Sequence, residues 1–158
     1  MTLINTITGE IYEAVIQEIE WFELETLADN DDFEFNWTKE DSYGIYKISI
    51  INDSEILGLM SVSNHVEELR IHIRLLESAK HCVGKNKEID RISGCLIAYA
   101  CQLSVSFGYD GFVSLVPKTR LIDHYRNSFG FTQMGRQLAV FMESADFLIR
   151  KFIYDEEI

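Results

Sequence analysis

The residues best placed to do chemistry lie in a strand, a polar loop and a helix that follow one another directly. Over residues 69–75, apolar and basic side chains alternate, which is the two-residue period of a strand with one buried face. A polar loop that contains a glycine follows over residues 81–90, and an apolar helix is predicted over residues 91–107. Free backbone N–H groups at a helix start bind anions without any special side chain. The stretch therefore predicts an anion site, and an ordinary helix start capped by Asp90 is the alternative.

A second strand and a second helix continue this pattern. The apolar run Phe112–Val116 lacks alternation, as expected for a strand that is covered on both faces. The helix predicted over residues 117–131 carries Tyr125 and ends at Gly130. Strand, helix and strand in this order predict a right-handed parallel crossover or a closely related mixed-sheet connection.

The ends of the chain are harder to assign than its middle. Segment 15–27 mixes apolar and acidic residues and fits either a strand or a helix. Alternating aromatic residues over 33–37 predict a short strand, which leaves no room for two long helices. Segments 44–51 and 55–62 flank turn residues and predict a hairpin.

Near the C-terminus, residues 133–142 predict one further strand. Ser144 is expected to cap a last helix over residues 145–152. The sequence leaves open whether the strand after Gln133 pairs within the monomer or across a homodimer.

Length, composition and charge bound the class of protein. The chain has 158 residues, of which 47% are hydrophobic, and this predicts a single domain over residues 1–158. No apolar run approaches the roughly 20 residues that span a bilayer, and the start of the chain lacks the features of a signal peptide. We therefore expect a cytoplasmic protein with no membrane partner. The net charge of −12 opposes nucleic-acid binding and suits a cationic ligand, although solubility alone also explains it.

The cysteines and histidines predict no metal centre. The cysteines are odd in number and lack the spacing of a zinc site or a disulfide framework. Cys95 and Cys101 fall within the predicted helix and are expected to be small core residues. No ligand spacing with acidic partners is visible for the histidines outside the predicted strand, which are His65, His81 and His124. The basic strand face formed by Arg70, His72 and Arg74 is expected to be solvated or held in a salt-bridge network.

The ordered set of motifs resembles the GCN5-related N-acetyltransferase (GNAT) superfamily. That family has a strand, a loop with the consensus Gln/Arg-x-x-Gly-x-Gly/Ala, a helix ending near a glycine, a further strand, and a helix ending in Tyr-x-x-x-Gly-Phe or a close variant. Here the loop falls on residues 91–94, and residues 125–131 match the longer form Tyr-x-x-x-Leu-Gly-Phe, with Phe129 in the leucine position. Segment 74–87 also resembles a bacterial subgroup of the superfamily. The resemblance covers about residues 44–142, and it rests on the order of the motifs because each is weak alone.

The resemblance implies an α/β (α+β) acyl-CoA N-acyltransferase fold, with a mixed, mostly antiparallel sheet and helices on both faces. It implies an enzyme that transfers acetyl from its cosubstrate acetyl-CoA to an amine by direct attack. In the family, backbone N–H groups of the loop bind the CoA pyrophosphate, and these map onto Arg91, Ile92, Ser93 and Gly94. The end of the preceding strand pairs with the pantetheine arm, which maps onto Leu75 and Leu76.

Four further side chains are candidates for roles in acetyl transfer. The family tyrosine that protonates the departing thiolate maps onto Tyr125, with an ordinary amphipathic-helix residue as the alternative. Glu77, near the end of the predicted strand, is a candidate general base, with a plain strand-end carboxylate as the alternative. Lys85 and Lys87 are candidate contacts of the coenzyme phosphates, with solvated loop lysines as the alternative.

Departures from the family pattern leave a second function open. Arg91 replaces the first loop glycine, and its side chain would either crowd the pyrophosphate or bind it. Lys118 stands where many members carry Asn, and the two N-terminal helices that usually shape the acceptor site are short or absent. The enzyme hypothesis predicts a small-molecule or peptide amine as acceptor. The alternative is a catalytically silent GNAT-fold protein that binds CoA or a protein partner, and an RNA-directed acetyltransferase is disfavoured by the net charge of −12.

Overall fold

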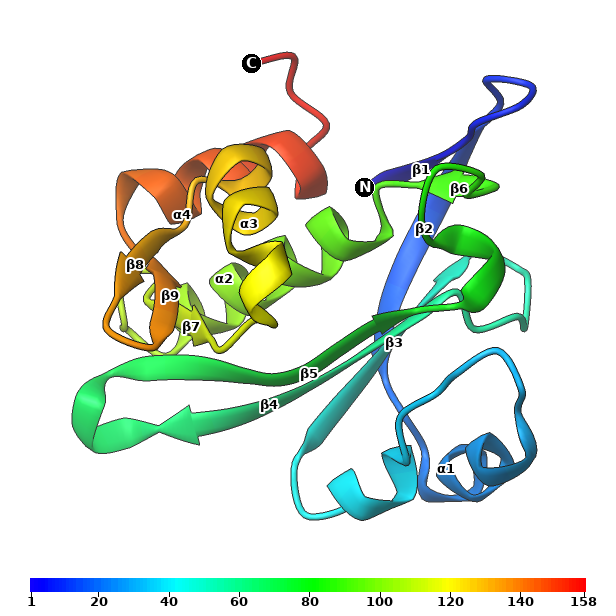
Figure 1. Cartoon of the computed structure of the whole chain (residues 1–158), viewed down its shortest axis with the longest axis horizontal. Helices are drawn as coiled ribbons and strands as arrows, with labels where there is room; N and C mark the ends of the chain where they lie inside the picture. Colours follow the sequence, from blue (N-terminus) through cyan, green and yellow to red (C-terminus); the bar gives the residue numbers. More distant parts are fainter. The chain divides into compact units, whose positions relative to one another are not determined.

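The computed structural model describes residues 1–158 as nine strands, four α-helices and several short helical turns. The strands are β1 (Thr2–Asn5), β2 (Ile11–Glu18), β3 (Gly44–Ile50), β4 (Gly58–His65), β5 (Arg70–Ser78), β6 (Ile89–Asp90), β7 (Val113–Leu115), β8 (Thr132–Met134) and β9 (Gln137–Val140). The α-helices are α1 (Trp21–Thr26), α2 (Ile92–Ser106), α3 (Ile122–Phe129) and α4 (Glu143–Leu148), all labelled in Figure 1.

Hydrogen bonds join the strands in the order β6-β1-β2-β3-β4-β5-β7-β9-β8. The pairs β1–β2, β1–β6, β2–β3, β7–β9 and β8–β9 are antiparallel. In contrast, β5 and β7 are parallel, with Ile71 opposite Val113 and Ile73 opposite Leu115. The mixed, mostly antiparallel sheet with one parallel pair therefore confirms the predicted fold class.

The chain forms two compact units. The first consists of Met1–Ser61 with Leu75–Leu96, and the second of Val62–Arg74 with Ile97–Ile158. Three elements, β4, β5 and α2, have residues in both units. The single domain over residues 1–158 stays a prediction.

The first unit packs the start of α2 closely against its strands. Its largest fully buried side chains are Leu3, Trp37, Ile48, Leu59, Met60 and Leu96. Gly58 makes the close packing possible, because a Cβ at this position would lie 2.6 Å from Ile92 Cγ2 and 3.0 Å from Ile48 Cγ2. The glycine thus fixes where the N-terminus of α2 lies, and this terminus is part of the candidate site.

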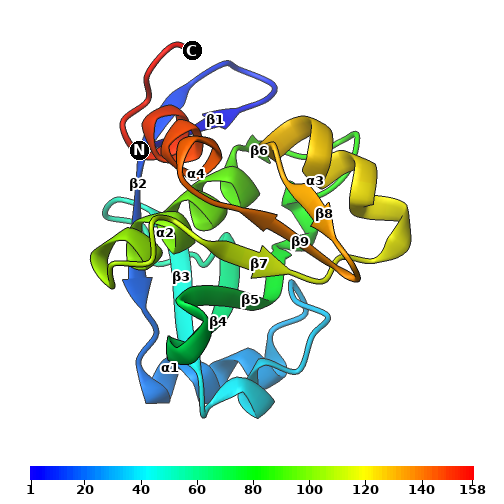
Figure 2. The same ribbon diagram turned by 90° about the vertical axis from the view of Figure 1, so that its left-hand side faces the viewer.

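The second unit surrounds β7 with the hairpin β8–β9 and with α3 and α4, which lie near β9 in Figures 1 and 2. Its largest fully buried side chains are Ile71, Ile97, Val113, Leu138, Val140 and Leu148. All three residues of β7 are buried, as predicted for a strand covered on both faces. Cys95 in the first unit and Cys101 in the second are fully buried in α2, which confirms their expected place in the core.

Two assignments before β3 change in the structure. The ambiguous segment 15–27 contains the end of a strand and then a helix, since β2 continues to Glu18 and α1 begins at Trp21. The predicted strand over residues 33–37 is wrong. The N–H groups of Glu34 and Phe35, which a strand would offer to its neighbour, are taken by the Glu77 carboxylate instead. A 3₁₀ helix, Trp37–Glu40, follows, and the expected lack of long helices in this region is confirmed.

Other strand boundaries shift for local reasons. The strand predicted over residues 55–62 begins only at Gly58, because the Asp53 side chain accepts the Glu55 N–H and prolongs the turn. Leu69 is not part of β5, since it has a φ of 52° and is exposed. Residues 133–142 do not form one strand, because Gly135 has a φ of 65° in the turn between β8 and β9.

The last helix begins earlier than predicted. Ser144 lies inside α4, and Met142 is its N-cap residue. The Ser144 hydroxyl instead accepts the Phe141 N–H and donates to the Phe141 carbonyl. The pairing question is answered within the chain, since β9 pairs with both β7 and β8 of the same molecule. None of the helices has the length and apolar character needed to cross a membrane.

Candidate functional site

The end of β5 extends past the last residue that β7 pairs with. The parallel register ends at Ile73 opposite Leu115, while β5 continues to Ser78. Leu75 and Leu76 lie in this extension and are half-buried. The structure therefore places the two predicted pantetheine contacts on a part of β5 that β7 does not cover.

The chain then turns from β5 into α2 through the predicted loop. A short helix, Lys80–Cys82, is followed by Gly84 with a φ of 81°, and the two residues of β6 pair with β1. The helix α2 starts at Ile92, and its first backbone bond runs from the Cys95 N–H to the Arg91 carbonyl. The N–H groups of Ile92, Ser93 and Gly94 precede that bond and have no acceptor within the helix. The predicted anion-binding groups are thus brought together at one helix start.

Arg91 holds the backbone conformation of a glycine. Its φ is 82°, in the left-handed region that residues with a Cβ rarely occupy. The Arg91 N–H donates to Asp90 Oδ1 at 2.8 Å, and its side-chain Nε donates to the Thr2 carbonyl at 3.0 Å. Arg91 therefore makes a left-handed turn directly before α2, and two hydrogen bonds hold it there.

A carboxylate lies next to Arg91, just before this helix start. Asp90 Oδ1 accepts the Arg91 N–H and also pairs with Lys87 Nζ at 2.7 Å. Burial acts to raise the pKa of Asp90, but hydrogen bonds from Lys87 and the Arg91 N–H outweigh it and leave the pKa below its ordinary value. Asp90 is thus charged and bonded to the Arg91 N–H, which precedes α2, so its predicted role as the cap of this helix stays a prediction. Lys85 is exposed in the loop.

Glu77 is fully engaged by a neighbouring loop. Its Oε2 accepts the Glu34 N–H at 2.6 Å, and its Oε1 accepts the Trp37 Nε1–H at 2.8 Å and the Phe35 N–H at 3.3 Å. Both carboxylate oxygens thus already hold a donor. The role of Glu77 as a general base stays a prediction, and this geometry favours an anchoring role instead.

Tyr125 lies in an aromatic cluster at the end of α3, in the second unit. Its ring centroid is 6.0 Å from that of Phe129 and 5.8 Å from that of Phe131. Gly130 ends the helix with a φ of 72°, and the Phe131 N–H bonds back to the Tyr125 carbonyl at 3.4 Å. Burial raises the pKa of Tyr125, so its hydroxyl keeps its proton at neutral pH and can act as a proton donor.

In the second unit, Ser114 joins two basic side chains of β5 in a polar network. Ser114 Oγ accepts Arg70 NH1–H at 2.7 Å and bonds His72 Nδ1 at 2.8 Å, and Arg70 also pairs with Glu68. Burial, followed by the nearby Arg70 charge, lowers the pKa of His72 to about 4. One predicted element is present, the ion pair of Arg70 with Glu68, whereas the bonds that join Arg70 and His72 through Ser114 were not predicted. The one signal of Ser114 is that it is the only polar residue in the run Phe112–Val116.

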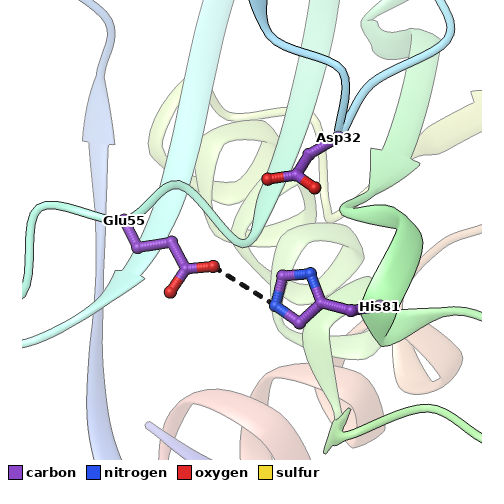
Figure 3. Close-up of side chains that lie close together, drawn as sticks. All are labelled: Asp32, Glu55 and His81. Carbon is purple, nitrogen blue, oxygen red and sulfur yellow. Dashed lines mark ion pairs between the residues drawn. The ribbon is translucent and has the colours of Figure 1, made fainter.

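One further cluster brings a histidine together with two carboxylates. His81 Nε2 lies 3.2 Å from Glu55 Oε1, and Asp32 lies close to both (Figure 3). Sequence spacing did not reveal this cluster, because its members come from three separate segments of the chain.

Comparisons with known proteins give matches among solved structures only. No protein-family model and no curated protein sequence matches the chain. A spermidine N-acetyltransferase chimera from Vibrio cholerae and hSSAT has a TM-score of 0.61 at 11% identity, covering 86% of this chain and 98% of that one.

Two bacterial acetyltransferases match over a similar span. An acetyltransferase of the GNAT family from Streptococcus pneumoniae has a TM-score of 0.57 at 12% identity, covering 82% of this chain and 100% of that one. A Bacillus subtilis acetyltransferase in complex with CoA has a TM-score of 0.56 at 12% identity, covering 83% of this chain and 99% of that one. Identities this low establish the fold alone. Together with the order β5, loop, α2, β7 and α3, these matches show that the chain has the fold of the GNAT superfamily.

Proposed function

We propose that this protein is an N-acetyltransferase that transfers acetyl from acetyl-CoA to an amine. The observation that carries the proposal is the helix start at residues 91–94. There, a non-glycine residue holds a left-handed turn directly before the helix, and three N–H groups remain free of helix partners. Strain at a single backbone position is most often kept where function needs it. The fold shared with acetyltransferases of known structure supports the same conclusion.

Coenzyme binding would use the backbone before any side chain. The N–H groups of Ile92, Ser93 and Gly94 would hold the pyrophosphate. The end of β5 at Leu75 and Leu76, beyond its pairing with β7, would pair with the pantetheine arm. Lys85 would add a point charge for the phosphates.

Asp90 and Lys87 would have to rearrange when the coenzyme binds. The Asp90 carboxylate accepts a helix-start N–H and carries the same charge sign as a phosphate. Lys87 would exchange its pairing with Asp90 for a phosphate, so the cation stays paired in both states.

The transfer itself needs a neutral amine and a proton for the leaving group. The amine nitrogen attacks the thioester carbonyl carbon, the C–S bond breaks, and an amide and a thiolate form. The Tyr125 hydroxyl would give its proton to the thiolate sulfur, and the proton lost by the attacking nitrogen would pass to solvent. We assign no proton transfer to Glu77, because both of its carboxylate oxygens already accept hydrogen bonds.

The acceptor class follows from charge. With a net charge of −12, the protein would concentrate cationic ligands, so amines that carry further positive groups are the first candidates. One of the structural neighbours is a spermidine N-acetyltransferase, which is consistent with a polycationic small molecule. A cytoplasmic location and a homodimer are kept as predictions.

Calorimetric titration of the purified protein with acetyl-CoA, followed by a screen of amines, tests the proposal. We expect saturable binding, turnover with at least one cationic amine, and a fall in kcat of roughly 10²–10⁴-fold in Tyr125→Phe with an unchanged acetyl-CoA Kd. The variant Tyr154→Phe, which removes the hydroxyl of an exposed tyrosine in the same unit, is the matched control. Absence of acetyl-CoA binding would overturn the proposal.

The second candidate is a silent protein that binds CoA without turnover. The hydrogen bonds to both Glu77 carboxylate oxygens favour it, because the candidate general base then has no uncommitted oxygen to accept a proton. Binding of CoA with no turnover across the amine screen, and no effect of Tyr125→Phe, would select this candidate.

A further inference from the structure

Three side chains with metal-ligand chemistry meet outside the candidate coenzyme contacts. His81 belongs to the short helix after β5, Glu55 to the loop between β3 and β4, and Asp32 to the loop after α1. Figure 3 shows both carboxylates directed toward the imidazole ring of His81. All three residues belong to the first compact unit.

Their separations match those of ligands around one small cation. His81 Nε2 and Glu55 Oε1 are 3.2 Å apart, and the ligand atoms of all three residues lie within 4.8 Å of one another. Two ligand atoms bound to a tetrahedral zinc at about 2.0–2.1 Å stand roughly 3.4 Å apart. The His81–Glu55 pair is therefore already at coordination spacing, and a modest side-chain rotation would bring Asp32 to it.

Backbone hydrogen bonds hold the three segments together independently of the side chains. The Lys80 N–H donates to the Asp32 carbonyl at 3.1 Å, which joins the His81 segment to the Asp32 segment. The Ala79 N–H donates to the Leu57 carbonyl at 2.9 Å, which joins the same segment to the loop of Glu55. The ligand atoms thus sit on a scaffold that does not need the ion to assemble.

The charge at this place is unbalanced. Asp32 and Glu55 bring two carboxylates, and the one basic group that faces them in the cluster is the His81 imidazole. No hydrogen bond or ion pair engages the Asp32 carboxylate, and the Glu55 side chain is 52% exposed, which leaves an open path for an ion. A divalent cation would neutralise both carboxylates and use the lone pair of the imidazole.

We propose that Asp32, Glu55 and His81 bind one zinc ion. One nitrogen and two oxygen ligands suit this borderline ion, and three protein ligands leave its fourth position to water. The ion would clip the end of β5 to the two loops and hold the segment that leads into the candidate coenzyme loop. The sequence-based expectation of no metal rests on ligand spacing along the chain, where no two of these three residues are near each other.

The test is zinc titration by calorimetry of the full chain, stripped with a chelator and kept reduced with a phosphine. We expect one zinc ion per chain, with affinity lowered by about 10- to 100-fold or more in Glu55→Gln and His81→Gln. The exposed His124→Gln is the matched control and should bind like the wild type. Zinc should also raise the Tm of the wild type and leave that of His81→Gln unchanged.

Cobalt substitution separates this site from the cysteines. Visible bands of four-coordinate cobalt without an intense near-ultraviolet thiolate band are expected, since all three cysteines are buried. No zinc binding by the wild type would overturn the proposal, as would wild-type affinity in both Glu55→Gln and His81→Gln. Glu55→Gln changes an exposed side chain, so the test does not depend on a variant that fails to fold.

Discussion

The role of Glu77, near the end of β5, can be tested directly. Its hydrogen bonds favour a role as the anchor of the loop at residues 34–37, while its place at the end of the predicted strand made it a candidate general base. Trp37 is 1% exposed, so its indole N–H has no water to bond if the Glu77 carboxylate is removed. The informative change is Glu77→Gln, which keeps the shape of the side chain and one of its two oxygens.

The expected loss follows from the contacts. A hydrogen bond to a charged group contributes about 1.5–3 kcal/mol, against about 0.5–1.5 kcal/mol for a neutral one. In Glu77→Gln the single amide oxygen can accept a hydrogen bond from either the Glu34 N–H or the Trp37 Nε1–H. The NH₂ group, itself a donor, then faces the other N–H and cannot bond it. One charged bond is lost and the rest become neutral, so we expect the free energy of unfolding to fall by about 2–3 kcal/mol. For a chain of this size the Tm should fall by roughly 4–12 °C.

A double-mutant cycle with Trp37→Phe, measured by urea denaturation, isolates the contact. Trp37→Phe keeps an aromatic ring and removes the N–H donor, so the two changes together should cost about 1–2 kcal/mol less than their sum. Glu67→Gln, an exposed carboxylate in the turn before β5, is the control and should leave stability unchanged. Wild-type stability in Glu77→Gln, or strict additivity with Trp37→Phe, would refute the anchoring role. Wild-type stability combined with a loss of kcat would restore the general base.

Three further predictions concern the packing and the titration of the fold. The pKa of His72 is about 4 in the folded chain, where burial and then the Arg70 charge lower it from 6.5. The stability that neutral His72 contributes to the folded state is therefore fully present above pH 6.5 and is lost as the pH falls toward 4. After discounting for partial exposure, we expect a loss of about 1–2 kcal/mol in the free energy of unfolding, measured as the difference from His72→Gln. Gly58→Ala should destabilise by about 1–3 kcal/mol in thermal unfolding, since its Cβ would lie 2.6 Å from Ile92, and an unchanged Tm would contradict that packing. Gly111→Ala should cost at least as much, because Gly111 has a φ of 77° and its Cβ would lie 2.5 Å from that of Ala145; a Tm equal to that of the wild type would disprove this.

The part of the fold that the sequence predicted best is the part with strong local signals. The helix α2 lies within two residues of its predicted bounds, and β7 lies inside its predicted run. Gly108 and Gly130 both take positive φ values after helices, as a glycine at that position should. In each case the pattern is set by residues close together in the chain, so periodicity and glycine punctuation suffice.

What could not be predicted depends on contacts between distant residues. The aromatic alternation over residues 33–37 is a valid strand signal, yet a carboxylate from the end of β5 takes its N–H groups and prevents pairing. The two residues of β6 form a strand only because β1 offers an edge. The meeting of Asp32, Glu55 and His81 has the same origin. No window of sequence contains these partners, so no pattern within one window can reveal them.

Arg91 shows how a substitution that looks disruptive in sequence can keep the local geometry. The sequence leaves two alternatives, in which its side chain either crowds the coenzyme pyrophosphate or binds it. A left-handed φ of 82° costs a residue with a Cβ on the order of 1–3 kcal/mol, and the bonds to Asp90 and to the Thr2 carbonyl offset that cost. In this conformation Nε is held by the backbone of β1, so the side chain is neither loose nor free to approach an anion without first leaving Thr2. Arg91→Gly should therefore relieve the backbone strain while losing the Thr2 bond, which leaves stability nearly unchanged in thermal unfolding. A large loss of stability would mean that Arg91 stabilises the fold mainly through its bond to the Thr2 carbonyl of β1.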